Sequence, residues 1–195
     1  MSEIAIIAYN AGNTLSVLSA LSRLGANAIV TDDKEFIRKS SRIIFPGVGH
    51  AAPAAQYLKL HGLDTILKQA TQPVLGICLG MQLLCQHSEE GETTGLGVFD
   101  ANCRRFKTDT QKIPHMGWNS ISNLKGKLFC NISEQSYVYF VHSYRIDCCN
   151  HTSGLCNYEG PFSAALERDN FYGVQFHPEK SSTVGSKILE NFLKI

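Results

Sequence analysis

Two hydrophobic patterns alternate along the first half of the chain. The segments of strand length that are wholly or mostly apolar are residues 4–8, 28–30, 42–45 and 74–77. Such runs are typical of parallel strands that are covered on both faces. Apolar residues at helical spacing lie between or after them, at leucines 15, 18, 21 and 24, around 63–70 and over 79–86. Strands alternating with helices predict an α/β fold with an open, largely parallel sheet and right-handed crossovers.

The pattern after residue 94 changes to short strands and turns. Strands are predicted at 96–99 and 137–141, and a hairpin over 164–176 would turn at Arg168-Asp169-Asn170. A closing helix is predicted over about 184–193, where Ile188, Leu189, Phe192 and Leu193 share one face. This part is expected to be antiparallel. No Gly-, Ser- or Pro-rich linker interrupts the chain, so we expect one domain over residues 1–195.

The composition excludes several classes of function. Of the 195 residues 44% are hydrophobic, which allows a full core, and 18 basic against 17 acidic side chains give a net charge of +1. Without a basic block the chain lacks the electrostatic footprint of a nucleic-acid binder. The apolar run Ile4–Tyr9 is too short to cross a bilayer and has no basic segment before it, so a cytoplasmic protein is expected.

Neither the cysteines nor the histidines have the spacing of metal ligands. The seven cysteines are an odd number, no two are three residues apart, and the seven histidines form no HExxH or HxxxH pair. We therefore expect free thiols, no metal site and no cofactor.

The sharpest chemical signal is Gly76-Ile77-Cys78-Leu79-Gly80, between a predicted strand and a predicted helix. It has the form of a nucleophile elbow, in which flanking glycines permit a turn tight enough to project the side chain above the sheet. The helix N-terminus would favour the thiolate of Cys78, and the Leu79 N–H would be one donor of an oxyanion hole. The alternative is a small buried cysteine in a tight turn.

A thiolate nucleophile needs a base, and His177-Pro178-Glu179 follows another predicted strand, 172–176. Proline favours an extended conformation at His177, and in an extended segment the side chains of His177 and Glu179 project to the same side. We therefore expect the carboxylate to orient the imidazole. The alternative is an ordinary turn with a solvated glutamate.

Pro46-Gly47-Val48-Gly49, after the third predicted strand, has three interpretations. With Ala52 it matches a relaxed dinucleotide-binding pattern, although that pattern belongs at the first strand–helix turn. It could also be a flexible backbone segment that faces Cys78 and supplies the second oxyanion donor. The third interpretation is a plain turn, with Pro53 at a helix start.

Five motifs in order resemble the class I (triad) glutamine amidotransferases. They are GICLGMQ at 76–82, QFHPE at 175–179, PGVG at 46–49, PHMGWN at 114–119 and YFVHSY at 139–144. The last three make the chain similar to the glutaminase subunits of imidazole glycerol phosphate synthase, in histidine biosynthesis. The resemblance runs from about Ile4 to Leu193.

The resemblance implies roles for individual residues. Cys78 would be the nucleophile, His177 the base and Glu179 its orienting group, with the amides of Val48 and Leu79 as the oxyanion hole. Glutamine would be held by Gly47, Gln82, Ser143 and Tyr144.

The resemblance also implies a partner, a (β/α)8-barrel cyclase in a heterodimer, which would receive the ammonia. The interface would include Asn10, Asn13 and Trp118. The chain departs from the family at Asn10-Ala11, where Gly-Met is common, and this departure affects partner contact and not the chemistry.

Two rival functions stay open at this point. One is a related glutaminase that serves another synthase, such as those forming amidines on surface sugars. The other is a nucleotide-binding module built on residues 47–52.

Overall fold

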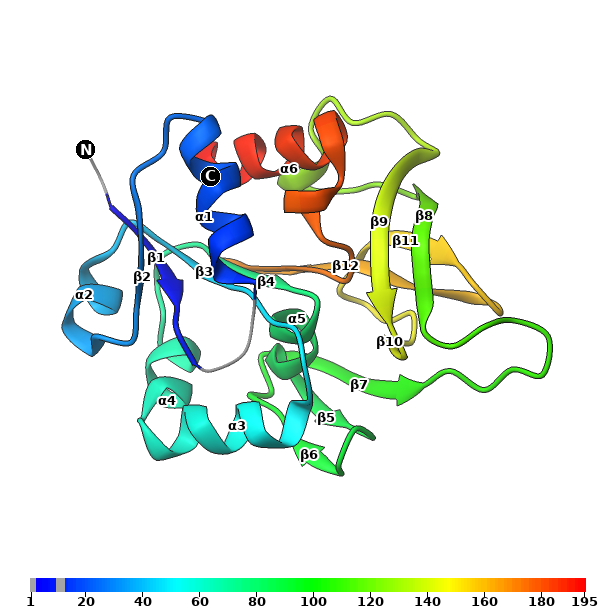
Figure 1. Cartoon of the computed structure of the whole chain (residues 1–195), viewed down its shortest axis with the longest axis horizontal. Helices are drawn as coiled ribbons and strands as arrows, with labels where there is room; N and C mark the ends of the chain where they lie inside the picture. The colour runs from blue at the N-terminus through cyan, green and yellow to red at the C-terminus, as the bar shows by residue number, and fades with distance from the viewer. Residues whose placement is uncertain (1–2, 10–12) are drawn as a thin grey trace.

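The computed structural model describes residues 3–9 and 13–195, which form two sheets flanked by helices (Figure 1). The larger sheet has nine strands in the order β2-β1-β3-β4-β13-β12-β11-β8-β9, and the smaller has the order β10-β7-β5-β6. The strands of the larger sheet are β1 (Ile4–Ile7), β2 (Ala28–Thr31), β3 (Arg42–Phe45), β4 (Val74–Ile77), β8 (His115–Ser122), β9 (Ser136–His142), β11 (Thr152–Asn157), β12 (Pro161–Arg168) and β13 (Phe171–Val174). Those of the smaller are β5 (Cys85–Ser88), β6 (Thr93–Thr94), β7 (Phe99–Arg105) and β10 (Tyr144–Ile146).

The helices lie on both faces of the larger sheet (Figure 1). They are α1 (Thr14–Arg23), α2 (Lys34–Lys39), α3 (Ala51–Leu60), α4 (Leu63–Lys68), α5 (Leu79–Leu84) and α6 (Ser182–Lys194), with two 3₁₀ turns, η1 (Lys127–Phe129) and η2 (Pro178–Lys180). Apolar side chains of α1 and α6 pack on one face, and those of α2 to α5 pack on the other. The predicted α/β class is therefore confirmed.

Five neighbouring strands, β2, β1, β3, β4 and β13, are parallel, and each neighbouring pair from β13 to β9 is antiparallel. The first four continuous apolar runs form strands as predicted. The antiparallel hairpin of β12 and β13 is also confirmed, with Asp169 at a positive φ of 53° in its turn. The four-stranded sheet was not predicted, so parallel and antiparallel strand pairs are more evenly balanced in the structure than expected.

Asn13 and Gly25 bound the helix α1. The Asn13 side chain accepts a hydrogen bond from the Ser16 N–H at 3.3 Å. Gly25 takes a φ of 73° after the helix, and the Ala26 N–H bonds back to the Leu21 carbonyl, which is a Schellman ending. Leu15, however, is 72% exposed and not part of the core, because a spacing of three residues drifts away from the buried stripe of a 3.6-residue helix.

Other predicted boundaries are wrong. The helix predicted to end at Gln86 ends at Leu84, and Cys85 begins β5. The strand predicted at 96–99 instead begins at Phe99. The apolar residues before Phe99 belong to a connection whose backbone bonds to residues 83–86, so local hydrophobicity there reflects tertiary packing.

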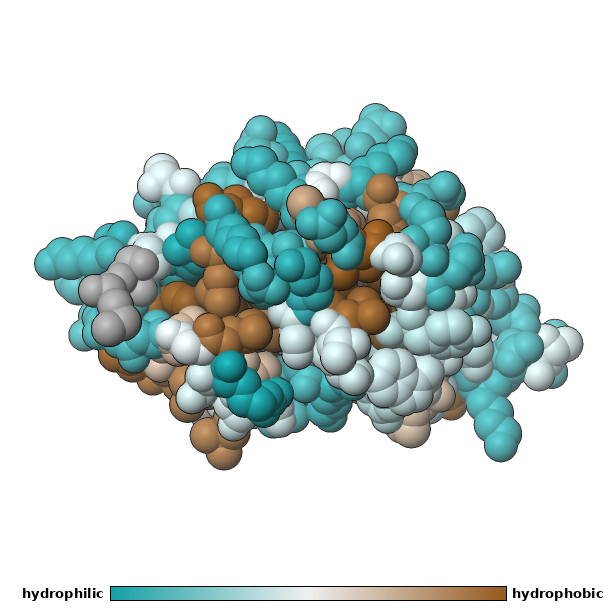
Figure 2. Space-filling view, turned by 90° about the horizontal axis from the view of Figure 1, so that it is seen from above, coloured by the Kyte–Doolittle hydropathy of each residue, from teal (hydrophilic) through white to brown (hydrophobic). Residues whose placement is uncertain are grey.

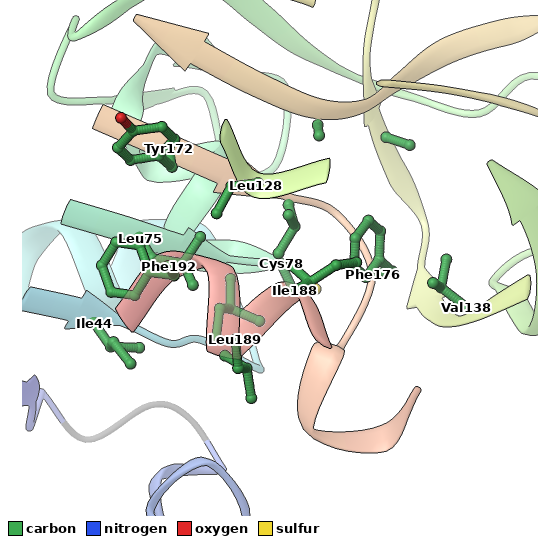
Figure 3. Packing of buried hydrophobic residues seen from close by; sticks show 14 of the residues in the cluster. Ile44, Leu75, Cys78, Leu128, Val138, Tyr172, Phe176, Ile188, Leu189 and Phe192 are labelled. Atoms are coloured by element: carbon green, nitrogen blue, oxygen red, sulfur yellow. The ribbon is translucent and has the colours of Figure 1, made fainter. Parts of the chain in front are cut away.

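The core between α6 and the sheet reaches the end of β4. Ile188, Leu189 and Phe192 of α6 are fully buried against Leu75 of β4, and Cys78 lies beside them (Figure 3). On the face seen from above, apolar surface shows in patches between polar side chains (Figure 2). Within the described residues, no helix is long and apolar enough to cross a membrane.

Candidate active site

Three adjacent parallel strands end at the same edge of the sheet. The order β3-β4-β13 and its register, with Phe45 opposite Gly76 and Val174 opposite Ile77, align their carboxyl ends. Gly47 follows β3, Cys78 follows β4 and His177 follows β13. Open α/β sheets bind ligands at this edge. The topology therefore brings the predicted site residues together although they are far apart in the sequence.

Cys78 has a strained backbone between β4 and α5. Its φ is 53° and its ψ is −109°, a conformation that side-chain-bearing residues rarely adopt and that is associated with functional sites. The flanking glycines have a different role from the one expected. A Cβ on Gly80 would collide with the Phe45 carbonyl, and one on Gly76 would lie 2.8 Å from the Met81 nitrogen. The glycines thus permit close packing, and Cys78 itself makes the sharp turn.

Cys78 is only 6% exposed, and two groups lie within hydrogen-bonding distance of its sulfur. The Gln175 Nε2 donates to Sγ at 3.6 Å, and the Val141 carbonyl oxygen is 3.9 Å from Sγ. An N–H donor favours the thiolate, whereas a carbonyl acceptor favours the thiol.

The predicted contact between His177 and Glu179 is present, with Nδ1 and Oε1 2.9 Å apart. The route differs from the prediction, because only His177 is extended and Glu179 lies in the 3₁₀ turn η2. Proline fits the first position of that turn. Both side chains are buried, at 2% and 1% exposure, and His177 Nε2 has no hydrogen-bond partner among the described residues.

Electrostatics keep His177 protonated in spite of its burial. Burial alone lowers its pKa, but the interactions with Cys78 and Glu179 outweigh this effect and raise the pKa to about 10. The imidazolium is thus a proton donor at neutral pH, held beside a cysteine by a buried carboxylate.

The position of His177 is fixed by β9. Its N–H donates to the Tyr139 carbonyl at 2.9 Å. The Ser181 hydroxyl donates to the His177 carbonyl at 2.6 Å and accepts from the Tyr139 N–H at 2.9 Å. These bonds hold the segment that follows β13 against β9.

A cavity of about 370 Å³ opens above Cys78. Its lining residues are Val48, Gly49, Cys78, Leu79, Gln82, Glu90, Pro114, Val141, His142, Ser143 and Tyr144. Six of the predicted site residues line it, whereas Gly47 packs behind it, where a Cβ would collide with Leu79. The other hollows of similar size in the described part of the chain are not lined by Cys78, so we take this cavity as the site.

The predicted oxyanion donors are not both aimed into the cavity. The Leu79 N–H donates to the Gly47 carbonyl at 3.4 Å. Because the C=O and N–H of a trans peptide point in opposite directions, the Val48 N–H then points away from Leu79.

Two polar residues of the site, Gln175 and Glu90, were not singled out from the sequence. Gln175 is 0% exposed and contacts Cys78, and its Oε1 accepts from Gln82 Nε2 at 3.0 Å. Glu90 lines the cavity, and its Oε2 accepts from the Ala51 N–H at 2.8 Å. Gln175 lies in the QFHPE motif, and its place in this motif is the signal that could have identified it. Nothing in the sequence pattern around Glu90 indicated the cavity.

Of the residues predicted for partner contact, neither Trp118 nor Asn13 lines the cavity. Trp118 on β8 is 52% exposed and packs edge-on against Tyr139, with 6.0 Å between ring centroids. Asn13 caps α1, and Asn10 lies outside the described residues. Over residues 3–9 and 13–195, no three His, Cys, Asp or Glu side chains gather as a metal site requires.

The fold and the cysteine beside a buried histidine–glutamate pair define a class of enzyme. The chain belongs to the glutamine amidotransferase class-I family, which matches residues 5–195. A Bacteroides thetaiotaomicron protein described as imidazole glycerol phosphate synthase subunit HisH is 50% identical over 195 residues, covering 99% of this chain and 100% of its own length. The Methanococcus maripaludis protein described as subunit HisH 2 is 46% identical, covering 98% of each chain.

Solved structures have the same fold at low sequence identity. A putative GMP synthase subunit from Thermoplasma acidophilum superposes with a TM-score of 0.79 at 18% identity, over 100% of this chain and 93% of that one. A glutamine amidotransferase from Thermotoga maritima gives 0.64 at 19% identity, over 99% and 83%. These similarities concern the fold alone.

Proposed function

We propose that this chain is the glutaminase subunit of imidazole glycerol phosphate synthase and that Cys78, His177 and Glu179 are its catalytic triad. The observation that carries the proposal is the placement of a strained cysteine and a buried His–Glu pair at adjoining strand ends, beside a cavity. The names of the full-length relatives support the choice of synthase. The family match over residues 5–195 supports one amidotransferase domain.

In the proposed reaction the Cys78 thiolate attacks the side-chain carboxamide carbon of glutamine. The C–N bond breaks as the His177 imidazolium gives its proton to the departing nitrogen, which leaves as ammonia, and a glutamyl thioester remains on Cys78. Water then attacks the thioester while neutral His177 takes its proton, and glutamate leaves with regeneration of the thiolate. Glu179 supports the imidazolium through the 2.9 Å hydrogen bond.

The cavity offers complementary groups to glutamine. Gln82 donates both of its amide protons inside the protein, to the Tyr144 carbonyl and to Gln175, so only its Oε1 remains for substrate. That oxygen and the Glu90 carboxylate are suited to the α-ammonium group. Ser143 and Tyr144 also line the cavity, and the lack of a side chain at Gly47 lets its backbone pack closely against Leu79.

The oxyanion hole is proposed to be the regulated element. A turn of the Gly47–Val48 peptide would free the Leu79 N–H from the Gly47 carbonyl and aim the Val48 N–H into the cavity. Gly49, with a φ of 112°, gives the segment the freedom for such a turn. One oxyanion donor contributes about 100- to 1000-fold to rate, so the turn is sufficient to switch the reaction.

The proposed partner is a (β/α)8-barrel cyclase that receives ammonia in an enclosed path. Contact through exposed Trp118 would reach the site, because Trp118 packs on Tyr139 and the Tyr139 carbonyl holds the His177 N–H. Asn10 and Asn13 are the other proposed contacts, and the protein is proposed to act in the cytoplasm.

One rival function loses support. A nucleotide-binding module would need the N-terminus of α3 for phosphate, but the Glu90 carboxylate already accepts the Ala51 N–H there. A carboxylate at this position would repel phosphate.

The test is glutamine turnover by the chain alone, with the cyclase, and with the cyclase and its nucleotide ligand. We expect a poor glutaminase in isolation, strong activation in the full mixture, and formation of imidazole glycerol phosphate. Equal rates in all three mixtures would refute the switch but not the triad. If a different synthase activated the chain and the cyclase mixture formed no imidazole glycerol phosphate, the surface-sugar alternative would be favoured.

A further inference from the structure

One buried amide beside Cys78 has no part in the reaction as proposed so far. Gln175 is fully buried, immediately after β13, and its Nε2 lies 3.6 Å from Sγ. The two ends of a side-chain amide have opposite polarity, so its effect on the sulfur depends on which end faces it.

Backbone carbonyls determine that orientation, because a carbonyl oxygen can only accept. Gln82 Nε2 lies 3.2 Å from the Tyr144 carbonyl oxygen, which requires the NH₂ end of Gln82 to face Tyr144. The second proton of the same NH₂ group then goes to Gln175 Oε1 at 3.0 Å. With its oxygen occupied in this way, Gln175 can present only its NH₂ end to Cys78.

The Tyr144 carbonyl is itself held from the other side. His142 Nδ1 donates to it at 2.7 Å, and His142 Nε2 accepts from His115 Nδ1 at 2.9 Å. Asn119 Nδ2 lies 3.3 Å from His115 Nε2 and 3.0 Å from the Asn157 carbonyl, which again can only accept. Each hydrogen bond in this network thus has a fixed direction. No side chain of the network can exchange its donor and acceptor ends without leaving a buried group unpaired.

We propose that Gln175 is a further catalytic residue, whose side-chain N–H stabilises the Cys78 thiolate, and that Gln82 is the positioning residue that keeps this N–H on the sulfur. The proposal rests on the proposed function of Cys78 and adds a residue to it. A thiolate accepts a hydrogen bond more strongly than a thiol does. The Val141 carbonyl on the other side favours the thiol, so Gln175 provides the opposing preference.

The first test measures the reactivity of Cys78 without substrate. Iodoacetamide alkylates thiolates and is uncharged, so its rate at Cys78 against pH, followed by peptide mass, reports the thiolate fraction. Gln175→Met keeps the length of the side chain and removes the donor. Its rate at neutral pH should fall about 10- to 100-fold, the range expected for a hydrogen bond to a charged group. Gln82→Met should cause a smaller loss, because it frees Gln175 to rotate.

The matched control is Asn191, a buried amide on α6 that donates to the Leu128 and Cys130 carbonyls, both at 2.8 Å. Asn191→Leu should lower stability and leave the alkylation profile unchanged. Wild-type alkylation in Gln175→Met would overturn the inference and leave the triad intact. Failure of wild-type Cys78 to react with a glutamine-like electrophile would instead count against the proposed function.

A second measurement needs no variant and covers the case in which Gln175→Met does not fold. The side-chain NH₂ resonances of Gln175 in the wild-type protein should move with the titration of Cys78, and this movement should disappear in Cys78→Ala. If the Gln175 resonances did not move as Cys78 titrates, the hydrogen bond to the thiolate would be contradicted.

Discussion

Two buried histidines of the site, His177 and His142, differ in charge. His177 is 1% exposed and His142 is 5% exposed. Burial lowers the pKa of His142 to about 3, with only a backbone carbonyl opposing, and lowers that of its partner His115 to about 4. At His177, Cys78 and Glu179 reverse the effect of burial and raise the pKa to about 10. The comparison shows that neighbouring charges, and not depth, decide which histidine can donate a proton.

The largest expected effect comes from removing the nucleophile. Cys78→Ala should abolish glutamine hydrolysis, because no thioester can form, while the cyclase complex keeps its synthesis from added ammonia. The measurement is glutamate release and product formation on the same complex. Loss of both activities would assign Cys78 to assembly and not to chemistry.

The next largest effects are expected from replacing His177 and Glu179, and the effect at His177 should be the larger. His177→Asn removes proton transfer and should cost about 10⁶-fold in turnover, whereas Glu179→Gln removes only support for the imidazolium and should cost about 10⁴-fold. Turnover of the two variants in the full complex checks this order. Equal losses would mean that Glu179 does more than orient and stabilise His177.

A smaller effect concerns stability against pH. Below pH 6.5 His115 and His142 bind protons in the unfolded chain but stay neutral in the folded protein. The free energy of unfolding should therefore fall as the pH is lowered from 6.5 toward 4. Above pH 6.5 folded His177 keeps a proton that the unfolded chain loses, so stability should also fall as pH rises toward 10. Urea unfolding from pH 4 to 8 measures both limbs.

Two variants separate these limbs. Glu179→Gln should flatten the slope between pH 6.5 and 8, and His142→Gln should flatten the slope below pH 6.5. If Glu179→Gln leaves the upper slope unchanged, the carboxylate does not hold the charge on His177.

The smallest effect is expected from metal chelation. Cys78 supplies the nucleophile and His177 the proton, so no step of glutamine hydrolysis calls for a Lewis acid. Glutamine turnover should be unchanged by a chelator once any metal requirement of the cyclase is controlled for. A loss that zinc or magnesium restores would contradict the assignment.

The same comparison shows how much of the site the sequence could predict. Cys78 and the His177-Pro178-Glu179 triplet lie directly after apolar strands, so local pattern was enough to find them. The His115–His142 pair and the Gln82–Gln175 pair meet only through strand pairing and helix packing. Hydrogen bonds between such distant residues leave no local spacing to detect.

The fold was predictable to a similar degree. Continuous apolar runs gave the four strands β1 to β4, because strands covered on both faces need them. The helix α2 was missed because it is six residues long and mostly charged, KEFIRK. The helix α3 was anticipated only as a helix start at Pro53 in one of three interpretations, because its small residues obscure the buried stripe of Ala51, Ala54 and Leu58.

The central claim is that Cys78 is the acylated nucleophile, and a glutamine-analogue electrophile tests it most directly. The complex with the cyclase is treated with 6-diazo-5-oxo-norleucine, and all seven cysteine positions are then examined by peptide mass spectrometry. We predict one covalent adduct, on Cys78, with glutamine slowing its formation and His177→Asn reducing it. An intact Cys78 in an inactivated complex, or an adduct on another cysteine, would contradict the account.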